Sequence, residues 1–265
     1  MRNAFKLGVI GDPVEHSLSP EIHHQFGKLT NIDLSYQRYH VQKHELEDFI
    51  QAFFCNGGYG LNVTLPHKFR CIDFADVISD DVNKIGAANT LRINEQKKIV
   101  AESTDGIGFI YDCKVKKIEI KNKNVLIYGA GGAAQSILPA ISQEKPNKLM
   151  IANRTQAKIN LVLDKFSMHG ITLFEGSKKE IDLFINATSA GHSNSFTWGE
   201  RDDIFTRNTT FYDLSYGAAA GSFLNWCSQF SQRSFDGAGM LIAQAAYSFN
   251  HWFNILPSIN KINIS

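Results

Sequence analysis

Residues 125–134 read VLIYGAGGAA, and the architecture of the chain can be worked out from this stretch. The apolar run from Val125 to Tyr128 predicts a short buried strand, and a glycine turn and a helix follow it directly. Gly129, Gly131 and Ala134 fit the pattern G-x-G-x-x-A. In this pattern the first glycine permits the tight turn, the second lets backbone approach a pyrophosphate, and the third small residue lets the helix pack on the strand. A purely structural glycine turn is the alternative, but the strand and helix on either side favour a dinucleotide site. Its residues are Gly129, Ala130, Gly131, Gly132 and Ala133.

The residues after the next expected strand, Leu149 to Ile151, bear on the choice of nicotinamide cofactor. NAD-binding proteins carry an acidic residue here, about 20 residues beyond the turn, for the ribose 2′-hydroxyl. This chain instead has Asn153, Arg154 and Thr155, so no carboxylate repels a 2′-phosphate and the guanidinium can bind one through two hydrogen bonds. Lys158 follows and can reach the same phosphate. Asn153 or Thr155 could instead cap a helix beside a solvated arginine, but the charge pattern favours NADP.

Strand-like and helix-like segments alternate along most of the chain, which predicts an α/β fold with parallel sheets. In the first hundred residues we expect strands over 7–10 and 61–65, helices from Ser19 and over 44–54, and a hairpin of 90–93 with 99–101. The strand at Val125 opens a second series, which continues with strands at 183–185 and 211–212. A final helix contains Met240, Tyr247 and Trp252 and is too short to form a domain alone. The predicted division is a substrate-binding domain over 1–105, a dinucleotide-binding domain over 106–236, and a C-terminal helix over 237–265 that packs on the first domain.

The composition indicates a small-molecule partner. Of the 265 residues, 27 are basic and 26 acidic, so a net charge of +1 provides no global attraction to nucleic acid or to a membrane surface. The four cysteines form no CxxC pair and the nine histidines no HExxH motif, so neither a metal site nor a disulfide framework is predicted. The N-terminus has no apolar signal segment, and no stretch approaches the ~20 apolar residues of a membrane span. We therefore expect a cytoplasmic protein.

Six further motifs stand out because they place polar side chains beside glycine or proline. They are HSLSP (16–20), NVTLPHK (62–68), GAANT (86–90), STDG (103–106), NATSAG (186–191) and GAGMLIAQ (237–244). Together with the glycine turn and residues 153–155, they resemble the shikimate dehydrogenase family over nearly the whole chain. The resemblance implies an α/β substrate domain joined to a Rossmann-type NADP-binding domain. It also implies reversible, NADPH-dependent reduction of 3-dehydroshikimate to shikimate, a step towards chorismate and the aromatic amino acids.

Shikimate carries one carboxylate and three hydroxyls, so its pocket needs neutral hydrogen-bonding groups more than charge. Ser17 and Ser19, two residues apart, can both donate to the carboxylate, although Ser19 could equally be the N-cap of a helix that has Pro20 at its first position. From residue type alone, Lys68 would be a surface lysine and Asp105 an N-cap. The resemblance instead implies that they are the catalytic pair, because hydride transfer at the ring carbonyl must be accompanied by a proton on oxygen.

The resemblance implies roles for several other residues. Thr64, Asn89 and Gln244 match residues that contact the ring hydroxyls in the family. Tyr216 matches a tyrosine near the substrate carboxylate. Leu214 and Gly237 fall near the nicotinamide, and Asp80 on the cofactor side. Asn89 could instead satisfy local backbone in a turn, and Gln244 could be a helix residue that faces solvent. Because Gln244 follows the cofactor domain in sequence, we expect the last helix to return to the substrate domain and the two units to move as hinged lobes.

Three positions depart from the usual family pattern. Ser103 stands where asparagine is usual, Ala218 where proline is usual, and His192 where an apolar residue is usual. The alternatives to the main interpretation are a quinate/shikimate dehydrogenase, which often prefers NAD, and a catalytically silent NADP-binding regulator. A monomer and a homodimer are both compatible with the sequence.

Overall fold

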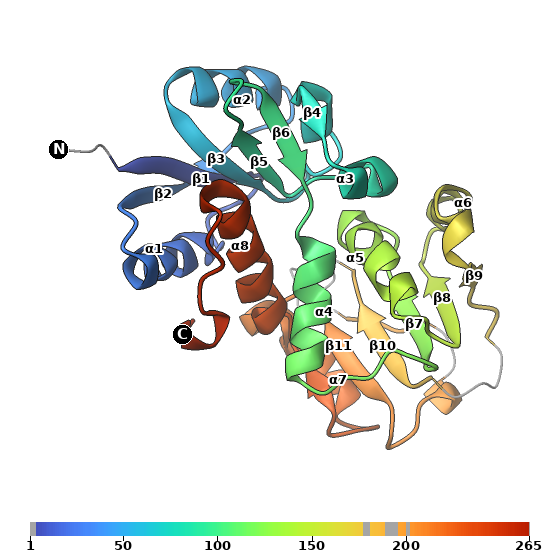
Figure 1. Ribbon diagram of the computed structural model, residues 1–265. Coiled ribbons are helices and arrows are strands. Elements are labelled where there is room, and N and C mark those ends of the chain that lie inside the picture. Colours follow the sequence, from blue (N-terminus) through green and yellow to red (C-terminus); the bar gives the residue numbers. More distant parts are fainter. Residues whose placement is uncertain (1–3, 177–180, 189–195, 200–201, 265) are drawn as a thin grey trace. The chain divides into compact units, whose positions relative to one another are not determined.

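The computed structural model describes residues 4–176, 181–188, 196–199 and 202–264. The chain divides into two compact units (Figure 1). Unit 1 comprises Met1–Gly108 and Leu241–Ser265, and unit 2 comprises Phe109–Met240. Each unit is built on one six-stranded sheet with helices packed on it, so the predicted α/β class is confirmed. The C-terminal segment belongs to unit 1, although unit 2 separates the two parts of unit 1 in the sequence.

The sheet of unit 1 is mixed, with the strand order β2-β1-β3-β5-β6-β4. Strand β1 pairs in parallel with β2 and β3, whereas β5 is antiparallel to both β3 and β6. The β5–β6 pair is the predicted hairpin. The strands are β1 (Phe5–Gly11), β2 (Leu34–His40), β3 (Gly58–Val63), β4 (Val77–Ile78), β5 (Thr90–Ile93) and β6 (Ile99–Glu102).

Successive residues of a strand point to opposite sides of the sheet, and in this sheet apolar side chains on both sides are covered by helices. Leu7 and Val9 of β1 belong to the cluster that contains Tyr36 and Trp252, whereas Ile10 packs with the side chains of α2. Helices α1 and α8 pack together through Phe26 and Phe249 and lie side by side in Figure 1. The helices of unit 1 are α1 (Ser19–Thr30), α2 (Leu46–Cys55), η1 (Cys71–Phe74), α3 (Asp80–Ile85) and η6 (Ile259–Lys261). Helices α4 (Asp105–Val115) and α8 (Ala238–Phe253) each contain residues of both units.

Two sequence-based expectations for unit 1 are wrong. Ser19 is not an N-cap, because α1 already includes it and Leu18 occupies the cap position without a side-chain cap bond. The strand expected over 61–65 ends at Val63. The backbone turns there instead, since the His67 amide donates to the Thr64 carbonyl at 2.9 Å and the Asp12 amide donates to the Leu65 carbonyl at 3.0 Å.

The sheet of unit 2 is entirely parallel, with the order β12-β11-β10-β7-β8-β9. Read from β9, the strands follow chain order 3-2-1-4-5-6, the doubly wound arrangement in which ligands bind where the order reverses. That point lies between β7 and β10, at the carboxyl ends of the strands. The strands are β7 (Asn124–Tyr128), β8 (Lys148–Ala152), β9 (Ile171–Leu173), β10 (Leu183–Asn186), β11 (Thr210–Asp213) and β12 (Ser234–Phe235).

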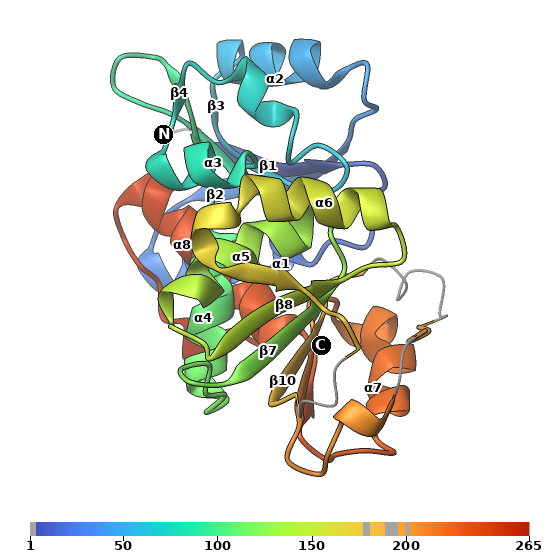
Figure 2. The same ribbon diagram turned by 90° about the vertical axis from the view of Figure 1, so that its right-hand side faces the viewer.

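Alternation along β7 separates two cores in unit 2. Val125 and Ile127 pack with helices α5 (Gly132–Gln143) and α6 (Gln156–Lys165), whereas Leu126 faces an aromatic cluster with α7 (Gly221–Cys227). Figure 2 shows α5 and α6 on one side of β7 and β8, with α7 on the other. Short 3-10 turns complete the unit, namely η2 (Ser167–His169), η4 (Asp202–Ile204) and η5 (Gly217–Ala220). Within the described ranges, no helix is long and apolar enough to cross a membrane.

Candidate active site

Lys68 and Asp105 form an ion pair in unit 1. Lys68 lies in the turn between β3 and η1, and Asp105 is the first residue of α4. The Lys68 Nζ to Asp105 Oδ2 distance is 2.6 Å, and the two side chains are 13% and 7% exposed. An ion pair so shielded from water is costly to break on one side only, because a buried charge is then left without its partner. The second oxygen, Oδ1, accepts from the amide of Asn89 at 2.9 Å, so the Asp105 carboxylate is engaged by two side chains.

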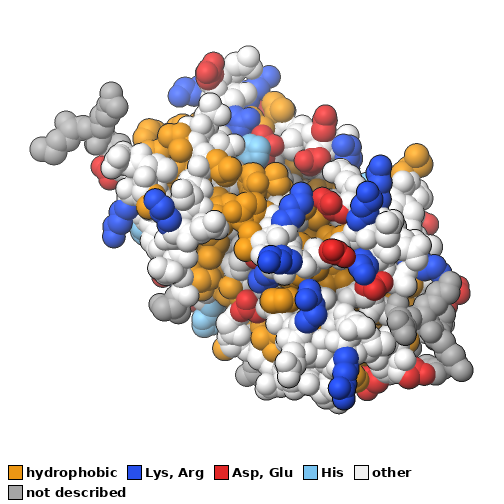
Figure 3. Space-filling model, turned by 60° about the horizontal axis from the view of Figure 1, so that its bottom comes forward, with side chains coloured by type: hydrophobic (Ala, Val, Ile, Leu, Met, Phe, Trp, Pro, Cys, Tyr) orange, Lys and Arg blue, Asp and Glu red, His pale blue; other side chains and the backbone are white. Residues whose placement is uncertain are grey.

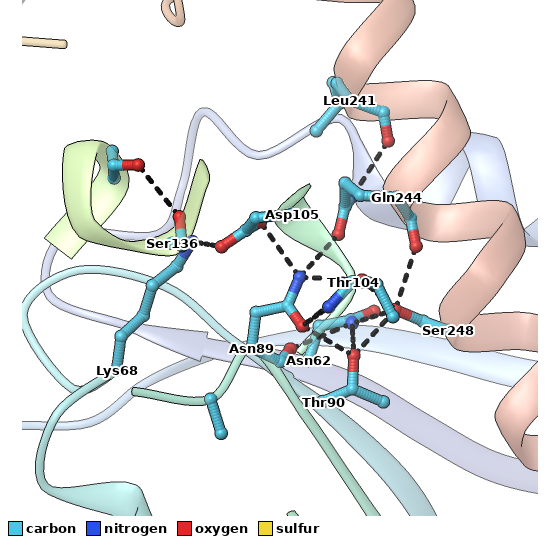
Figure 4. A network of polar contacts seen from close by, with 12 residues as sticks. Asn62, Lys68, Asn89, Thr90, Thr104, Asp105, Ser136, Leu241, Gln244 and Ser248 are labelled. Atoms are coloured by element: carbon cyan, nitrogen blue, oxygen red, sulfur yellow. Dashed lines mark hydrogen bonds and ion pairs between the residues drawn. The ribbon is translucent and has the colours of Figure 1, made fainter. Parts of the chain in front are cut away.

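Asn89 links Gln244 to the Lys68–Asp105 ion pair through hydrogen bonds (Figure 4). Its Oδ1 accepts from the Thr104 backbone amide at 2.9 Å, and its Nδ2 lies 2.9 Å from the Asp105 carboxylate and 3.1 Å from Gln244 Oε1. Because a backbone amide only donates and a carboxylate only accepts, this amide orientation is unambiguous. Gln244 also donates to the Leu241 carbonyl at 2.8 Å and is only partly exposed. It does not simply face solvent, and Lys68, Asn89, Asp105 and Gln244 form one polar group.

Ser17 and Ser19 form a second polar group in unit 1. The Ser17 hydroxyl donates to Ser19 Oγ at 3.1 Å, and Arg38 Nε donates to the Ser17 carbonyl at 2.7 Å. Ser19 is buried and Ser17 half-buried. Thr64 lies half-buried in the turn after β3. Among the described residues, the structure gives no side-chain hydrogen bond from Ser17, Ser19 or Thr64 to the Lys68 group.

The glycine turn follows β7 at the point where the strand order of unit 2 reverses. Gly129 has φ +124°, and a Cβ there would lie 2.6 Å from the Ala187 carbonyl oxygen. Only glycine therefore suits this position. Gly131 is the N-cap residue of α5, no side chain caps that helix, and a Cβ at Gly131 would meet no atom within 4 Å. Open space beside uncapped amides is what an incoming phosphate needs.

Residues 153–155 lie beside this turn, because the Gly129 amide donates to the Ala152 carbonyl at the end of β8 (2.8 Å). Thr155 occupies the N-cap position of α6, but its hydroxyl makes no cap bond, and Asn153 Nδ2 donates to the Thr155 carbonyl at 3.1 Å. The side-chain capping alternative is therefore wrong. Arg154 and Lys158 are exposed. The set is basic and contains no carboxylate, which fits a 2′-phosphate.

The remaining residues predicted on the cofactor side are Leu214, Gly237 and Asp80, and Tyr216, which is predicted near the substrate carboxylate, lies in the same loops as the first two. Leu214, Tyr216 and Gly237 lie in the loops after β11 and β12, where the Gly237 amide donates to the Ser215 carbonyl at 2.8 Å. Asp80 is exposed in the first turn of α3 and belongs to unit 1, unlike the others. Two of the three positions that depart from the usual family pattern can be located. Ser103 has a buried hydroxyl with no hydrogen-bond partner within the described ranges, and Ala218 lies in η5. His192 and residues 189–191 of the NATSAG motif lie outside the described residues.

Asp213, to which the sequence assigned no role, is fully buried at the end of β11. Its carboxylate accepts from Asn186 Nδ2 at 3.1 Å and from the Ser215 amide at 2.8 Å. Burial raises the pKa of this carboxyl to about 6, although the hydrogen bonds from Ser215 and Asn186 oppose the rise. The signal in the sequence was a polar residue ending each of two neighbouring apolar strands. Asn186, which is paired with Asp213, also accepts from the backbone amides of Thr188 and Leu214 and so orders both loops.

Comparisons with known proteins identify the family of the chain. Residues 9–91 match the model of the shikimate dehydrogenase substrate binding domain, and residues 113–205 match that of shikimate / quinate 5-dehydrogenase. A curated protein from Vesicomyosocius okutanii, named shikimate dehydrogenase (NADP(+)), is 38% identical over 97% of each chain. The solved structure of an Ael1 enzyme from Pseudomonas putida has a TM-score of 0.88 at 32% identity and covers 99% of each chain. The shikimate 5-dehydrogenase of Thermus thermophilus, solved in complex with NADP(H) and shikimate, has a TM-score of 0.86 at 25% identity, covering 97% of this chain and 96% of its own. The chain belongs to the shikimate dehydrogenase family.

Proposed function

We propose that this protein is an NADP-dependent shikimate dehydrogenase, which reversibly reduces 3-dehydroshikimate to shikimate on the route to chorismate and the aromatic amino acids. The observation that carries the proposal is the shielded Lys68–Asp105 ion pair, with Asn89 and Gln244 hydrogen-bonded around it. A silent regulator has no need of a lysine and an aspartate held 2.6 Å apart away from water. The 38% identity to a curated NADP-dependent relative supports the same activity.

Lys68 is the proton donor in this proposal. When bound, NADPH supplies the hydride for the ring carbonyl. The Lys68 ammonium gives a proton to the carbonyl oxygen, and neutral Lys68 takes that proton back in the oxidation direction. Asp105 holds the lysine head in place through the 2.6 Å contact and balances its positive charge. Asn89 restricts rotation of the Asp105 carboxylate by occupying its other oxygen.

The substrate is proposed to bind to two groups of neutral side chains in unit 1. Ser17 and Ser19 would donate to the carboxylate, to which the resemblance also assigns Tyr216, and Thr64, Asn89 and Gln244 would bind the ring hydroxyls. Arg38 supports this assignment, since its 2.7 Å hydrogen bond to the Ser17 carbonyl fixes the backbone of the serine turn. Neutral groups suit a polyol with a single charge, because each of its hydroxyls both donates and accepts.

The cofactor is proposed to bind on unit 2. The amides of Gly129 to Ala133 would bind the pyrophosphate, and Asn153, Arg154, Thr155 and Lys158 the 2′-phosphate end. Leu214 and Gly237 would border the nicotinamide. The open space at Gly131 and the exposed basic side chains support this assignment. The role of Asp80 remains a prediction from the resemblance alone.

The cell compartment and the assembly form a separate part of the proposal. We place the protein in the cytoplasm, which the four unpaired cysteines support, because disulfides are rare there. A monomer and a homodimer both fit the proposed activity, and sedimentation velocity at several protein concentrations would distinguish them.

The test is a comparison of two cofactors with two substrates. NADPH and NADH are each offered with 3-dehydroshikimate and with 3-dehydroquinate, and the decrease in nicotinamide absorbance is followed. We expect fast turnover of NADPH with 3-dehydroshikimate and little in the other three mixtures. Preferred turnover of 3-dehydroquinate or of NADH would indicate a quinate/shikimate dehydrogenase. No turnover in any mixture, with NADPH still bound, would indicate a regulator.

A further inference from the structure

Ser248 is a fully buried hydroxyl in α8, one helical turn beyond Gln244. Its Oγ lies 2.9 Å from Asn62 Nδ2 on β3, 2.7 Å from Thr90 Oγ1 on β5, and 3.1 Å from Thr104 Oγ1 ahead of α4. Figure 4 shows these side chains converging on Ser248 from the sheet side. One hydroxyl therefore connects the last helix of the chain to three segments of unit 1.

The direction of these hydrogen bonds follows from Asn62. Its Nδ2 donates to the Asn89 carbonyl at 3.1 Å, and its Oδ1 accepts from the Tyr36 hydroxyl at 2.8 Å. Since a carbonyl only accepts, the NH2 group of Asn62 must face Asn89 and Ser248. Ser248 therefore accepts from Asn62, and its own hydrogen can go to the Gln244 carbonyl at 3.0 Å, whereas either hydroxyl can donate in the contacts with Thr90 and Thr104. Four hydrogen-bonding groups thus surround the Ser248 hydroxyl, which leaves it no capacity for a further partner.

The same groups border the proposed substrate site. Thr104 contacts Asn89 through its backbone amide and its hydroxyl, and Asn89 in turn donates towards Gln244 and Asp105. Helix α4 also approaches Gln244 so closely that a Cβ at Gly108 would lie 2.8 Å from Gln244 Cβ. Gln244 is thus in close contact with Gly108 and with the network to which Ser248 belongs.

We infer that Ser248 is a positioning residue for substrate binding, which acts through Gln244 and Asn89. This inference rests on the proposed function, because it assumes that these two amides bind the ring hydroxyls. Ser248 itself does not reach substrate, since its oxygen is occupied and buried. Without its hydroxyl, Asn62, Thr90 and Thr104 each lose a hydrogen-bonding neighbour, and the amides of Gln244 and Asn89 gain rotational freedom where the substrate needs them fixed.

The primary test is Ser248→Ala, measured on the full-length enzyme. We expect KM for shikimate to rise roughly tenfold, with kcat within about threefold of wild type and the Kd of NADP unchanged. The matched control is Ser231→Ala, because Ser231 is a buried serine of unit 2 whose hydroxyl donates to the Arg207 carbonyl at 3.1 Å. Similar thermal destabilisation in both variants, with KM raised only at Ser248, supports positioning. An unchanged KM in a folded Ser248→Ala enzyme overturns it.

A double-mutant cycle with Gln244→Ala separates positioning through Gln244 from a general structural effect. If Ser248 acts through Gln244 and Asn89, adding Ser248→Ala to Gln244→Ala raises KM by clearly less than about tenfold. Full additivity overturns the inference. Should Ser248→Ala fail to fold, Ser248→Cys keeps the side-chain size with weaker hydrogen bonding, and the same criteria apply to it. An inactive wild type contradicts the proposed function, whereas an active wild type with unaltered KM in the variants contradicts only the role of Ser248.

Discussion

At the scale of single residues, Lys68 offers the most direct test of the chemistry. Lys68→Ala should lower kcat by roughly 10²–10⁴-fold, because the proton donor is lost, while NADPH binding on unit 2 stays near normal. Steady-state kinetics and fluorescence titration with NADPH measure the two quantities. Lys84→Ala, which removes an exposed lysine from the last turn of α3, is the control and should retain wild-type activity. Full activity of Lys68→Ala would remove the lysine from the mechanism.

Arg154 tests the choice of cofactor at the same scale. Arg154→Ala should weaken NADPH binding by at least about tenfold and leave NADH binding nearly unchanged, because only NADPH carries the 2′-phosphate. Calorimetric titration with each cofactor provides both constants. Arg207→Ala, at another exposed arginine of unit 2, should alter neither. Equal losses for the two cofactors would mean that Arg154 does not contact the 2′-phosphate.

At the scale of an element, the turn between β7 and α5 contains two glycines with different physical constraints. Gly129→Ala should unfold or strongly destabilise unit 2, because φ is +124° and the new Cβ would lie 2.6 Å from the Ala187 carbonyl oxygen. Gly131→Ala should leave the melting temperature near that of wild type, since its Cβ would meet no atom within 4 Å.

The methyl group that Gly131→Ala adds nevertheless enters the space proposed for the pyrophosphate. We therefore expect Gly131→Ala to weaken NADPH binding by roughly tenfold or more while the protein stays folded. Thermal melts together with NADPH titration of the two glycine variants make the comparison. A Gly131→Ala protein that binds NADPH as tightly as wild type would move the pyrophosphate away from this turn.

At the scale of the whole molecule, His23 links folding stability to pH. It is fully buried and stacks on Tyr36 with ring centroids 4.4 Å apart. Burial lowers the pKa of its imidazole to about 3, although the Asn62 side chain opposes this. As pH falls below about 6.5, the unfolded chain gains a proton that the folded chain does not accept until about pH 3. Folding stability is therefore lost on acidification across this window, by up to about 1.4 kcal/mol per pH unit from this group.

His23→Gln removes the group that makes folding stability fall with acid. Below about pH 6.5 its free energy of unfolding should decrease less steeply with acid than that of wild type, even if the variant is less stable near neutral pH. Urea denaturation followed by circular dichroism, from about pH 4.5 to about pH 7.5, gives both slopes. His16→Gln, at an exposed histidine of unit 1, is the control. Parallel curves for wild type and His23→Gln would show that His23 does not carry the acid sensitivity.

The surface drawn in Figure 3 carries charged side chains of both signs. Figure 3 shows basic and acidic side chains interspersed over the face that it draws. This agrees with a formal net charge of +1 for the whole chain. The net charge of the chain therefore provides no strong long-range attraction for an anionic substrate, and short-range hydrogen bonds gain in importance.

Short-range patterns were sufficient to predict much of this protein. The strand, glycine turn and helix at 125–143, the hairpin of β5 and β6, and the α/β class all follow from periodicity and from the backbone demands of glycine and proline, which act over a few residues. The edge strands β9 and β12 escaped detection because three and two residues are too few to show a period. The boundary of α1 at Ser19 depended on which backbone groups pair, and a cap-like residue alone does not reveal that.

The glycine turn and the family could be read directly from the order of the residues, since each depends on local spacing that needs no partner elsewhere. The convergence of residues far apart in the chain could not, because it exists only once the chain has folded. Asn89 meets Gln244 across 155 positions, and Asn62 meets Ser248 across 186, because α8 returns to the sheet of unit 1. Local patterns were silent on Ser248 for the same reason. The role of a buried hydroxyl is set by the groups that fold around it, and here those groups come from three other segments of the chain.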